Sequence, residues 1–411
     1  MQVIRHPIFV QTAVIVNPIS NPVFTCGFEC ASSGTSGGDA HLTVGSNASF
    51  STSTVRTGNR SLRINLPSSD DSSNFLGAAT TRNIIVGRIY IRFATLPNAN
   101  ILLFWVRDVN QGIFTEHYGI GWQQSSGTLR TARNNGGVMS FGTNGVTPIT
   151  GVWYRLDLKV TGGLSAPITV DGQIDGSVLN QLTNPVTDTI TAPACGALNN
   201  AQGEWFYDDA IISIASVDYP IGAGYVDLYV PTSDGTHNVA GANQFERGTT
   251  GTDITNATTN AYELVDEVPL NSVGSVPPTD DYITAIAPAN ATDYVEMKFG
   301  TAPGFSAPTK PPRAVESVVA VHQATTTTGN FRVALNDNGT VSDVANRTEA
   351  GQTTIRHFAK HFGSDPPSAA TEWNISSGNG NFLNLRARFY SSDADPDQSL
   401  DGVAIEAEFE P

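Results

Sequence analysis

Two adjacent carboxylates, Asp208 and Asp209, stand where an aromatic run meets an apolar β-branched run in the stretch EWFYDDAIISI, residues 204–214. Successive residues of a β-strand point to opposite faces, so the pair can share one site only where the strand ends or bulges. We therefore expect one carboxylate to face inward near Glu29 and the other outward. An inward carboxylate must be neutralised or coordinated, because an unpaired buried charge costs several kcal/mol. The alternative is a strand end whose carboxylates accept backbone N–H groups, with Arg60 as an ion partner.

Paired carboxylates also hydrolyse glycosides, and the spacing argues against that chemistry here. A retaining glycosidase needs two carboxyls about 5 Å apart, which an E-x-D-x-x-E spacing on one strand face supplies. The run ELVDEV (263–268) has the charges with the wrong spacing. The run IEAEFE (405–410) alternates its acids onto one strand face, with no His, Tyr or aromatic platform beside it. We expect that face to be a solvated sheet edge.

Other reactive constellations are weaker still. His357 and His361 are four residues apart with no evident third metal ligand, so we expect two exposed histidines. No G-x-S-x-G elbow, P-loop or G-x-G-x-x-G motif follows a strand pattern. Asn-x-Ser/Thr triplets at Asn256, Asn290 and Asn346 are expected by chance in a chain this rich in Asn and Thr. The sequence therefore predicts a protein that is not an enzyme.

Composition indicates the elements that must position these residues. The chain has 411 residues, 39 Gly, 23 Pro and a net charge of −16 from only 15% charged residues. Short Val, Ile, Phe and Tyr runs separated by Gly, Pro, Asn, Thr and Ser are typical of an all-β protein with many turns. The length allows two or three domains. The acidic balance makes nucleic acid a poor partner.

The three cysteines predict little cross-linking. Cys26 and Cys30 are close in sequence and Cys195 is distant, with no second CxxC and no zinc-finger spacing. A Cys26–Cys30 disulfide is one alternative, but extended strands constrain Cβ separation tightly. We expect buried free thiols.

The first 24 residues predict an extended arm. The apolar run IFVQTAVIV is bounded by Pro7 and Pro18, is too short to span a bilayer, and lacks a small-residue cleavage site. We expect no membrane partner. A β-branched arm with little core of its own can pair its backbone hydrogen-bonding groups along the edge of a sheet. We expect that sheet to belong either to the same chain or to a neighbouring one.

From residue 25 onward, the chain alternates turn residues with short strand patterns, among them SLRINL (61–66), RIYIRFATL (88–96), ILLFWVRD (101–108) and HYGIGWQQ (117–124). In VWYRLDLKV (152–160), Val152, Tyr154, Leu156 and Leu158 fall on one face, which predicts a half-buried antiparallel strand. The opposite face carries Trp153, Arg155, Asp157 and Lys159. The following run ITVDGQIDG predicts a hairpin that turns at Asp171 and Gly172.

The order of five segments in this half resembles the concanavalin A-like lectin/glucanase jelly rolls, a pattern shared by laminin-G-like domains and carbohydrate-binding modules. The segments are GFE (27–29), VRTGNRSLRI (55–64), GVWYRLDLKV (151–160), ITVDG (168–172) and WFYDDAIIS (205–213). The resemblance covers roughly residues 25–216.

That resemblance implies a structural calcium ion. In similar modules a Glu of the first strand, a carbonyl of a turn and an Asp of the final pair surround Ca²⁺, which prefers hard oxygen ligands. The matching positions are Glu29, a carbonyl of Gly58 or Asn59, and Asp209. Cysteines on both sides of Glu29 depart from the usual pattern.

A linker, DYPIGAGY (218–225), precedes a second set of strand patterns, among them YVDLYVP (225–231) and AYELVDEVP (261–269). We expect three parts: an arm (1–24), a jelly-roll domain (25–219) and a second antiparallel β-sandwich (220–411). The second half resembles uncharacterised virion proteins of tailed bacteriophages. The matching positions are Pro231 to Gly235, Tyr262 to Pro269, Asp280 to Ile283, Val315 to Val321, and Asp365, Pro366 and Trp373. The loop DPPSAATEW departs from that pattern.

These observations predict a non-enzymatic structural protein on the exterior of a tailed-phage virion, as a capsid decoration, head fibre or tail component. Its partners would be other virion proteins or further copies of itself, for example in a homotrimer. The alternative is a glycan-binding adhesin or carbohydrate-binding module for host-surface polysaccharide. Its candidate sugar-stacking residues are Trp105, Trp122, Trp153 and Trp205. A secreted polysaccharide hydrolase is a third, weaker interpretation.

Overall fold

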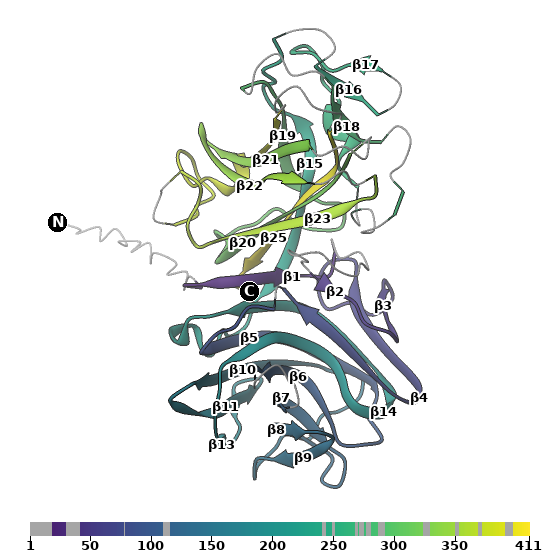
Figure 1. Ribbon diagram of the computed structural model, residues 1–411, viewed down its shortest axis with the longest axis vertical. Helices are drawn as coiled ribbons and strands as arrows, with labels where there is room; N and C mark the ends of the chain where they lie inside the picture. Colours follow the sequence, from purple (N-terminus) through teal and green to yellow (C-terminus); the bar gives the residue numbers. More distant parts are fainter. Residues whose placement is uncertain are drawn as a thin grey trace, which may run out of the picture.

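The computed structural model is built almost entirely of β-strands (Figure 1). It describes residues 19–29, 42–77, 79–109, 116–240, 244–248, 251–267, 270, 275–276, 281–286, 292–323, 329–349, 353–368, 372–390 and 398–411. The first 18 residues of the expected arm, Cys30 and Asn290 lie outside these ranges. The described helices are short 3₁₀ turns: η2 (Ser216–Asp218), η3 (Ala261–Leu264) and η4 (Phe382–Asn384).

The first sheet has 14 strands in the described chain, all from the N-terminal half. They are β1 (Pro22–Cys26), β2 (Leu42–Thr43), β3 (Ala48–Ser51), β4 (Ser61–Leu76), β5 (Ile84–Thr95), β6 (Ile101–Asp108), β7 (Glu116–Gln123), β8 (Thr128–Asn135), β9 (Val138–Phe141), β10 (Trp153–Gly163), β11 (Ala166–Ile174), β12 (Ser177–Val178), β13 (Leu182–Thr187) and β14 (Ile190–Ser213). The main hydrogen-bonded order is β12-β11-β10-β5-β14-β6-β7-β8-β9.

Strand β14 joins the two layers of this sandwich. Its first part, residues 190–198, pairs with β6, and its second part, residues 204–213, pairs with β5. The layers enclose one hydrophobic core that includes Ile91, Leu156 and Trp205. This architecture confirms the expected all-β sandwich in the N-terminal half.

The second sheet is built from the C-terminal half and has 11 strands among the described residues. They are β15 (Tyr225–Asp234), β16 (Phe245–Arg247), β17 (Thr252–Asp253), β18 (Ile283–Ala285), β19 (Tyr294–Thr301), β20 (Ala314–Gln323), β21 (Gly329–Asp337), β22 (Thr340–Glu349), β23 (Arg356–Gly363), β24 (Arg386–Tyr390) and β25 (Gln398–Phe409). All of their pairings are antiparallel. A separate core forms on this sheet around Phe389, Val403 and Phe409.

The period-2 pattern of residues 152–160 is confirmed on its apolar side. Tyr154, Leu156 and Leu158 lie in the first core. Val152 precedes the strand and is 44% exposed.

Three local predictions are wrong. Asp171 and Gly172 do not form a turn: they lie inside β11 opposite Lys159 and Leu158, and the chain turns instead at Asp175 and Gly176, which both have positive φ. The expected strand at 261–269 begins as the 3₁₀ turn η3. The run 405–410 is not an edge, because β25 is hydrogen-bonded to β15 and β20 on its two sides.

The described end of the arm belongs to the first sheet. Strand β1 pairs antiparallel with β14 of its own chain, and it lies between the two sheets in Figure 1. Phe24 and Cys26 are buried in the first core. Residues 22–24 therefore form part of the sandwich rather than of a free arm.

Candidate functional site

A buried ion pair joins the two sandwiches. Arg88 on β5 and Glu408 on β25 are both 0% exposed. The Arg88 guanidinium donates to both Glu408 oxygens, from Nη1 at 2.5 Å and from Nη2 at 2.7 Å. Arg88 Nη2 also donates to the backbone carbonyl of Asp209 at 3.0 Å. This two-pronged geometry fixes the relative direction of the two strands as well as their separation.

Two further arginines complete what we call the charged joint: Arg56, Arg88, Asp209, Arg313 and Glu408. Arg313 Nη2 donates to Glu408 Oε1 at 2.7 Å. Arg56 Nη1 donates to the Asp209 carboxylate and, at 3.1 Å, to the carbonyl of Gly224. Charged residues from both halves thus pair with one another where the sandwiches meet.

The aspartate pair of the EWFYDDAIISI stretch lies within this region at a bulge. The pairing of β14 with β5 shifts register between Asp208 and Ile211, and Asp209 has a φ of 49°. Both carboxylates are 0% exposed, so the carboxylate expected to face outward does not reach solvent. The second sandwich covers the face that the pattern alone would leave to solvent.

Each aspartate has its own partners. Asp208 Oδ2 accepts from the backbone N–H of Arg56 at 2.8 Å. Asp209 Oδ1 accepts from the Thr57 hydroxyl at 2.7 Å and from the Val226 N–H at 2.8 Å. Burial raises the pKa of both groups, and for Asp209 the Arg56 guanidinium opposes that rise. The ion partner in this pair is Arg56 rather than the expected Arg60.

Glu29, three residues after the end of β1, closes the same region. Its Oε1 accepts from the backbone N–H groups of Asn59 at 2.7 Å and Arg60 at 2.9 Å. Its Oε2 is buried without a hydrogen-bond partner. Burial raises the pKa of Glu29 to about 8, against the lowering effect of these two backbone hydrogen bonds. Glu29 therefore holds the Gly58 turn through N–H donors, whereas the calcium hypothesis required carbonyl oxygens there.

The placement of Asp209 does not fit the predicted calcium set of Glu29 and Asp209. The carboxylate and carbonyl of Asp209 face the guanidiniums of Arg56 and Arg88, which already supply positive charge. In the described part of the chain, no group of three or more His, Cys, Asp or Glu side chains is arranged to hold a metal ion. Calcium binding itself stays a prediction, which chelation tests.

Strand β1 ties the first sandwich to two acidic residues of the second. The Thr25 N–H donates to Glu316 Oε2 at 2.6 Å, and the Gly27 N–H donates to Glu406 Oε1 at 3.2 Å. Glu406 is 0% exposed, so the expectation that the acids of the 405–410 run are solvated is wrong. Their strand face packs on the first sandwich.

One of the two singled-out histidines also belongs to this contact. His361 lies opposite Glu316 on the neighbouring strand and its Nε2 pairs with the Glu316 carboxylate. Both His357 and His361 are half-buried rather than exposed. They do not form a metal site with any third described ligand.

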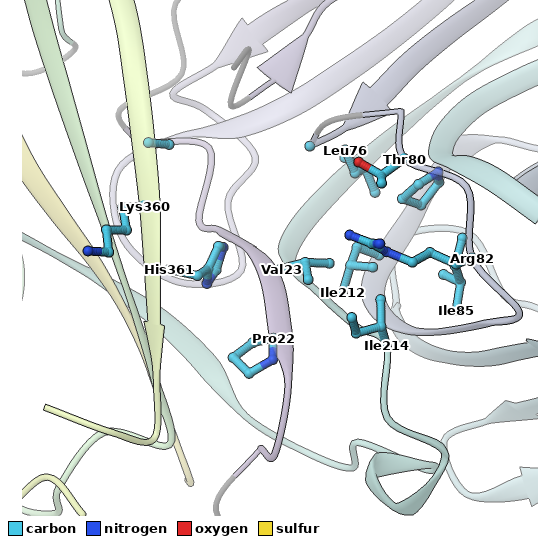
Figure 2. Close-up of a pocket in the computed structure, with 13 residues that line it drawn as sticks. Pro22, Val23, Leu76, Thr80, Arg82, Ile85, Ile212, Ile214, Lys360 and His361 are labelled. Atoms are coloured by element: carbon cyan, nitrogen blue, oxygen red, sulfur yellow. The ribbon is translucent and has the colours of Figure 1, made fainter. Parts of the chain in front are cut away.

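A cavity of about 340 Å³ opens beside β1, between the first sheet and β23 (Figure 2). Apolar side chains such as Val23, Ile85 and Ile212 line one wall, and Lys360 and His361 lie across from them. Lys360 Nζ donates to the carbonyl of Asp343 at 2.6 Å. The sandwiches therefore meet through a polar contact with a cavity at its margin that is apolar on one wall and basic on the other.

The structure separates the four candidate sugar-stacking tryptophans. Trp105, Trp122 and Trp205 are at most 4% exposed, which excludes them from stacking on a sugar at the surface. Trp153 is half-buried on the outward side of β10. Cys26 and Cys195 are both buried, as expected, and Cys195 is a free thiol.

Sequence reasoning identified Glu29, Asp208 and Asp209 but missed the arginines of the charged joint. Arg88 stands among apolar residues in the run of β5, with a burial pattern that is almost continuous. An arginine within such a buried strand is a sequence signal for a buried ion pair. Its partner is 320 residues away along the chain, so no local pattern connects the two.

No family model matches the chain, and no curated protein matches it. Several solved structures are similar to part of this chain. The "Cellulose induced protein, Cip1" is 16% identical, with 43% of this chain and 87% of that chain covered and a TM-score of 0.33. An endo-β-1,4-glucuronan lyase from the fungus Trichoderma reesei is 14% identical, with coverages of 47% and 98% and a TM-score of 0.34. The carbohydrate-binding module CBM66 from Bacillus subtilis is 11% identical, with coverages of 43% and 96% and a TM-score of 0.30. At these scores, no activity of those proteins is transferred to this chain.

Within the described residues, no helix is long and apolar enough to cross a membrane.

Proposed function

We propose that this chain is a non-enzymatic structural protein displayed on the exterior of a tailed-bacteriophage virion. In this role the molecule is a rigid unit in which the first sandwich is held in a fixed position relative to the second. Its partners are other virion proteins or further copies of the chain, with a homotrimer as one assembly.

The charged joint is the observation that supports this proposal. Domains within one chain usually meet through modest polar interfaces and move relative to one another. Here Arg88 and Glu408 are fully desolvated, and Glu408 also accepts from Arg313. Opening the joint would expose or unpair several buried charges, so the two sandwiches keep one orientation. A fixed orientation suits a particle component better than a flexible tandem of independent modules.

Particle fractionation tests this proposal. An antibody against the chain should detect it in phage particles purified through a density gradient, and gold labelling of intact particles should place it on the outside. A matched fraction of disrupted particles controls for interior proteins. Absence from purified particles, in a lysate that contains the protein, would reject the structural role.

A glycan-binding role is a second candidate, which Trp153 favours. This side chain is half-buried on an outward sheet face, opposite Arg92 on the neighbouring strand. An aromatic surface beside a guanidinium can stack on a sugar ring and donate hydrogen bonds to it. A glycan array separates the candidates, because a specific signal that is lost in Trp153→Ala would favour the adhesin.

A further inference from the structure

A row of alternating arginine and aromatic side chains crosses the outward face of four strands in the first sandwich. Arg63 on β4 is opposite Phe206 on β14, and Phe206 is opposite Arg92 on β5. Arg92 is in turn opposite Trp153 on β10. Adjacent strands are about 4.8 Å apart, so the row spans about 15 Å. That length accommodates a short linear chain laid across the strands.

A hollow of about 530 Å³ lies over this row. Phe206, which is 5% exposed, lines it together with Arg63 and Arg92. The segment 51–54, with the sequence Ser-Thr-Ser-Thr, lines it as well. The hollow thus combines apolar surface, two guanidiniums and several hydroxyl groups.

The two guanidiniums retain unused donors. Arg63 Nε donates to Glu204 Oε1 at 2.7 Å, and Arg92 Nε donates to the Gly151 carbonyl at 2.9 Å. Among the described residues, the terminal Nη groups of both arginines have no hydrogen-bond acceptor. The planar fork of a guanidinium matches the paired oxygens of a carboxylate or sulfate.

The remaining groups favour a sugar as the carrier of those anionic oxygens. Glu204 lines the hollow and can accept hydrogen bonds from sugar hydroxyls, and the Ser and Thr hydroxyls can both donate and accept. Trp153 extends the row with an aromatic ring. Nucleic acid is disfavoured by the net charge of −16, whereas an isolated pair of arginines can still pair with charges on a glycan.

We propose that this hollow binds an acidic glycan, a linear chain of sugars bearing carboxylate or sulfate groups. Arg63 and Arg92 pair with its anionic groups on either side of Phe206. The proposal rests on the glycan-binding candidate above and narrows it to one chemical class of ligand.

Binding of defined oligosaccharides to the full-length protein tests the proposal. The probes are an oligogalacturonate, a sulfated oligosaccharide, and a neutral oligosaccharide of the same length. We expect at least one acidic probe to bind about tenfold or more tightly than the neutral probe, with affinity falling as salt is added. Comparing the two acidic probes shows whether carboxylate or sulfate is preferred.

Charge-removing variants locate the site. Arg63→Gln and Arg92→Gln should each weaken binding of the acidic probe about tenfold, because each removes a charge-assisted contact. Arg332→Gln is the matched control: Arg332 also pairs through Nε with a carboxylate at 2.7 Å and lies over an aromatic ring, but in the second sandwich. Unchanged melting of each variant shows that it is folded.

Each outcome bears on a different claim. Equal binding of acidic and neutral probes, or acidic binding that neither hollow variant changes, overturns the acidic-glycan proposal while the glycan-binding candidate stands. No binding of any glycan by folded protein rejects both, and the virion role is then judged by particle fractionation alone.

Discussion

Removing Arg88 should weaken the whole molecule through the charged joint. Arg88→Met keeps an unbranched side chain but removes the two hydrogen bonds to Glu408 and the one to the Asp209 carbonyl. Glu408 remains 0% exposed in its site, with only Arg313 to neutralise it. Breaking a buried ion pair from one side costs about 3 to 5 kcal/mol. Because Arg313 is retained, we expect a loss at the lower end, about 3 kcal/mol.

Urea denaturation followed by circular dichroism measures this loss. Urea is chosen because a salt denaturant would screen the charges under test. Glu408→Leu should cost more than Arg88→Met, because it removes the carboxylate that both Arg88 and Arg313 pair with and leaves two buried guanidiniums without it. The double variant should cost less than the sum of the two single variants, because they share one interaction.

The surface pair of Arg332 and Asp343 is the matched control. Their side chains are 34% and 33% exposed, so Arg332→Met should cost no more than about 1 kcal/mol. The reasoning fails if Arg88→Met is as stable as the Arg332→Met control, or if the double variant shows purely additive losses. Either result would mean that the joint contributes no net coupling between the sandwiches.

The other predictions concern pH, the N-terminus, calcium and catalysis. Burial raises the pKa of Glu29 to about 8 in the folded protein from 4.5, so its contribution to stability is full below pH 4.5 and is lost as pH rises to about 8. Unfolding free energies measured across that window should fall less steeply in Glu29→Gln, and an unchanged slope would refute the assignment. Deleting residues 1–18 should abolish incorporation into particles without changing melting, whereas a cut at residue 24 should destabilise the fold because Phe24 is buried; normal assembly of the shorter chain would show that the arm is not an anchor. Chelation with EDTA should leave the melting temperature unchanged if Arg56 and Arg88 neutralise Asp209, and a decrease that added Ca²⁺ restores would instead support the calcium hypothesis. A polysaccharide panel should reveal no hydrolysis, and reproducible turnover of any member would overturn the non-enzymatic assignment.

The sequence alone predicted several long strands of the first sandwich. The period-2 alternation in the run around Leu156 and Leu158 identified both the strand and its core face, because side-chain direction along a strand is a local property. The boundaries of β6 coincide with the run ILLFWVRD. The run AYELVDEVP was misassigned, because apolar and β-branched content does not distinguish a short strand from a 3₁₀ turn.

Only the tertiary structure decided what covers the polar faces. Glu406 and Glu408 alternate along β25 as a solvated strand would, yet both are 0% exposed because that face packs on the first sandwich. Asp208 and Asp209 likewise lie at a bulge of β14, and their hydrogen-bond donors come from distant parts of the chain, such as Val226 for Asp209. Alternation determines which residues share a face, but whether water or another domain lies against that face depends on contacts hundreds of residues apart. For this reason the sequence indicated two sandwiches and a pair of aspartates, and the fold alone brought Arg88 to Glu408.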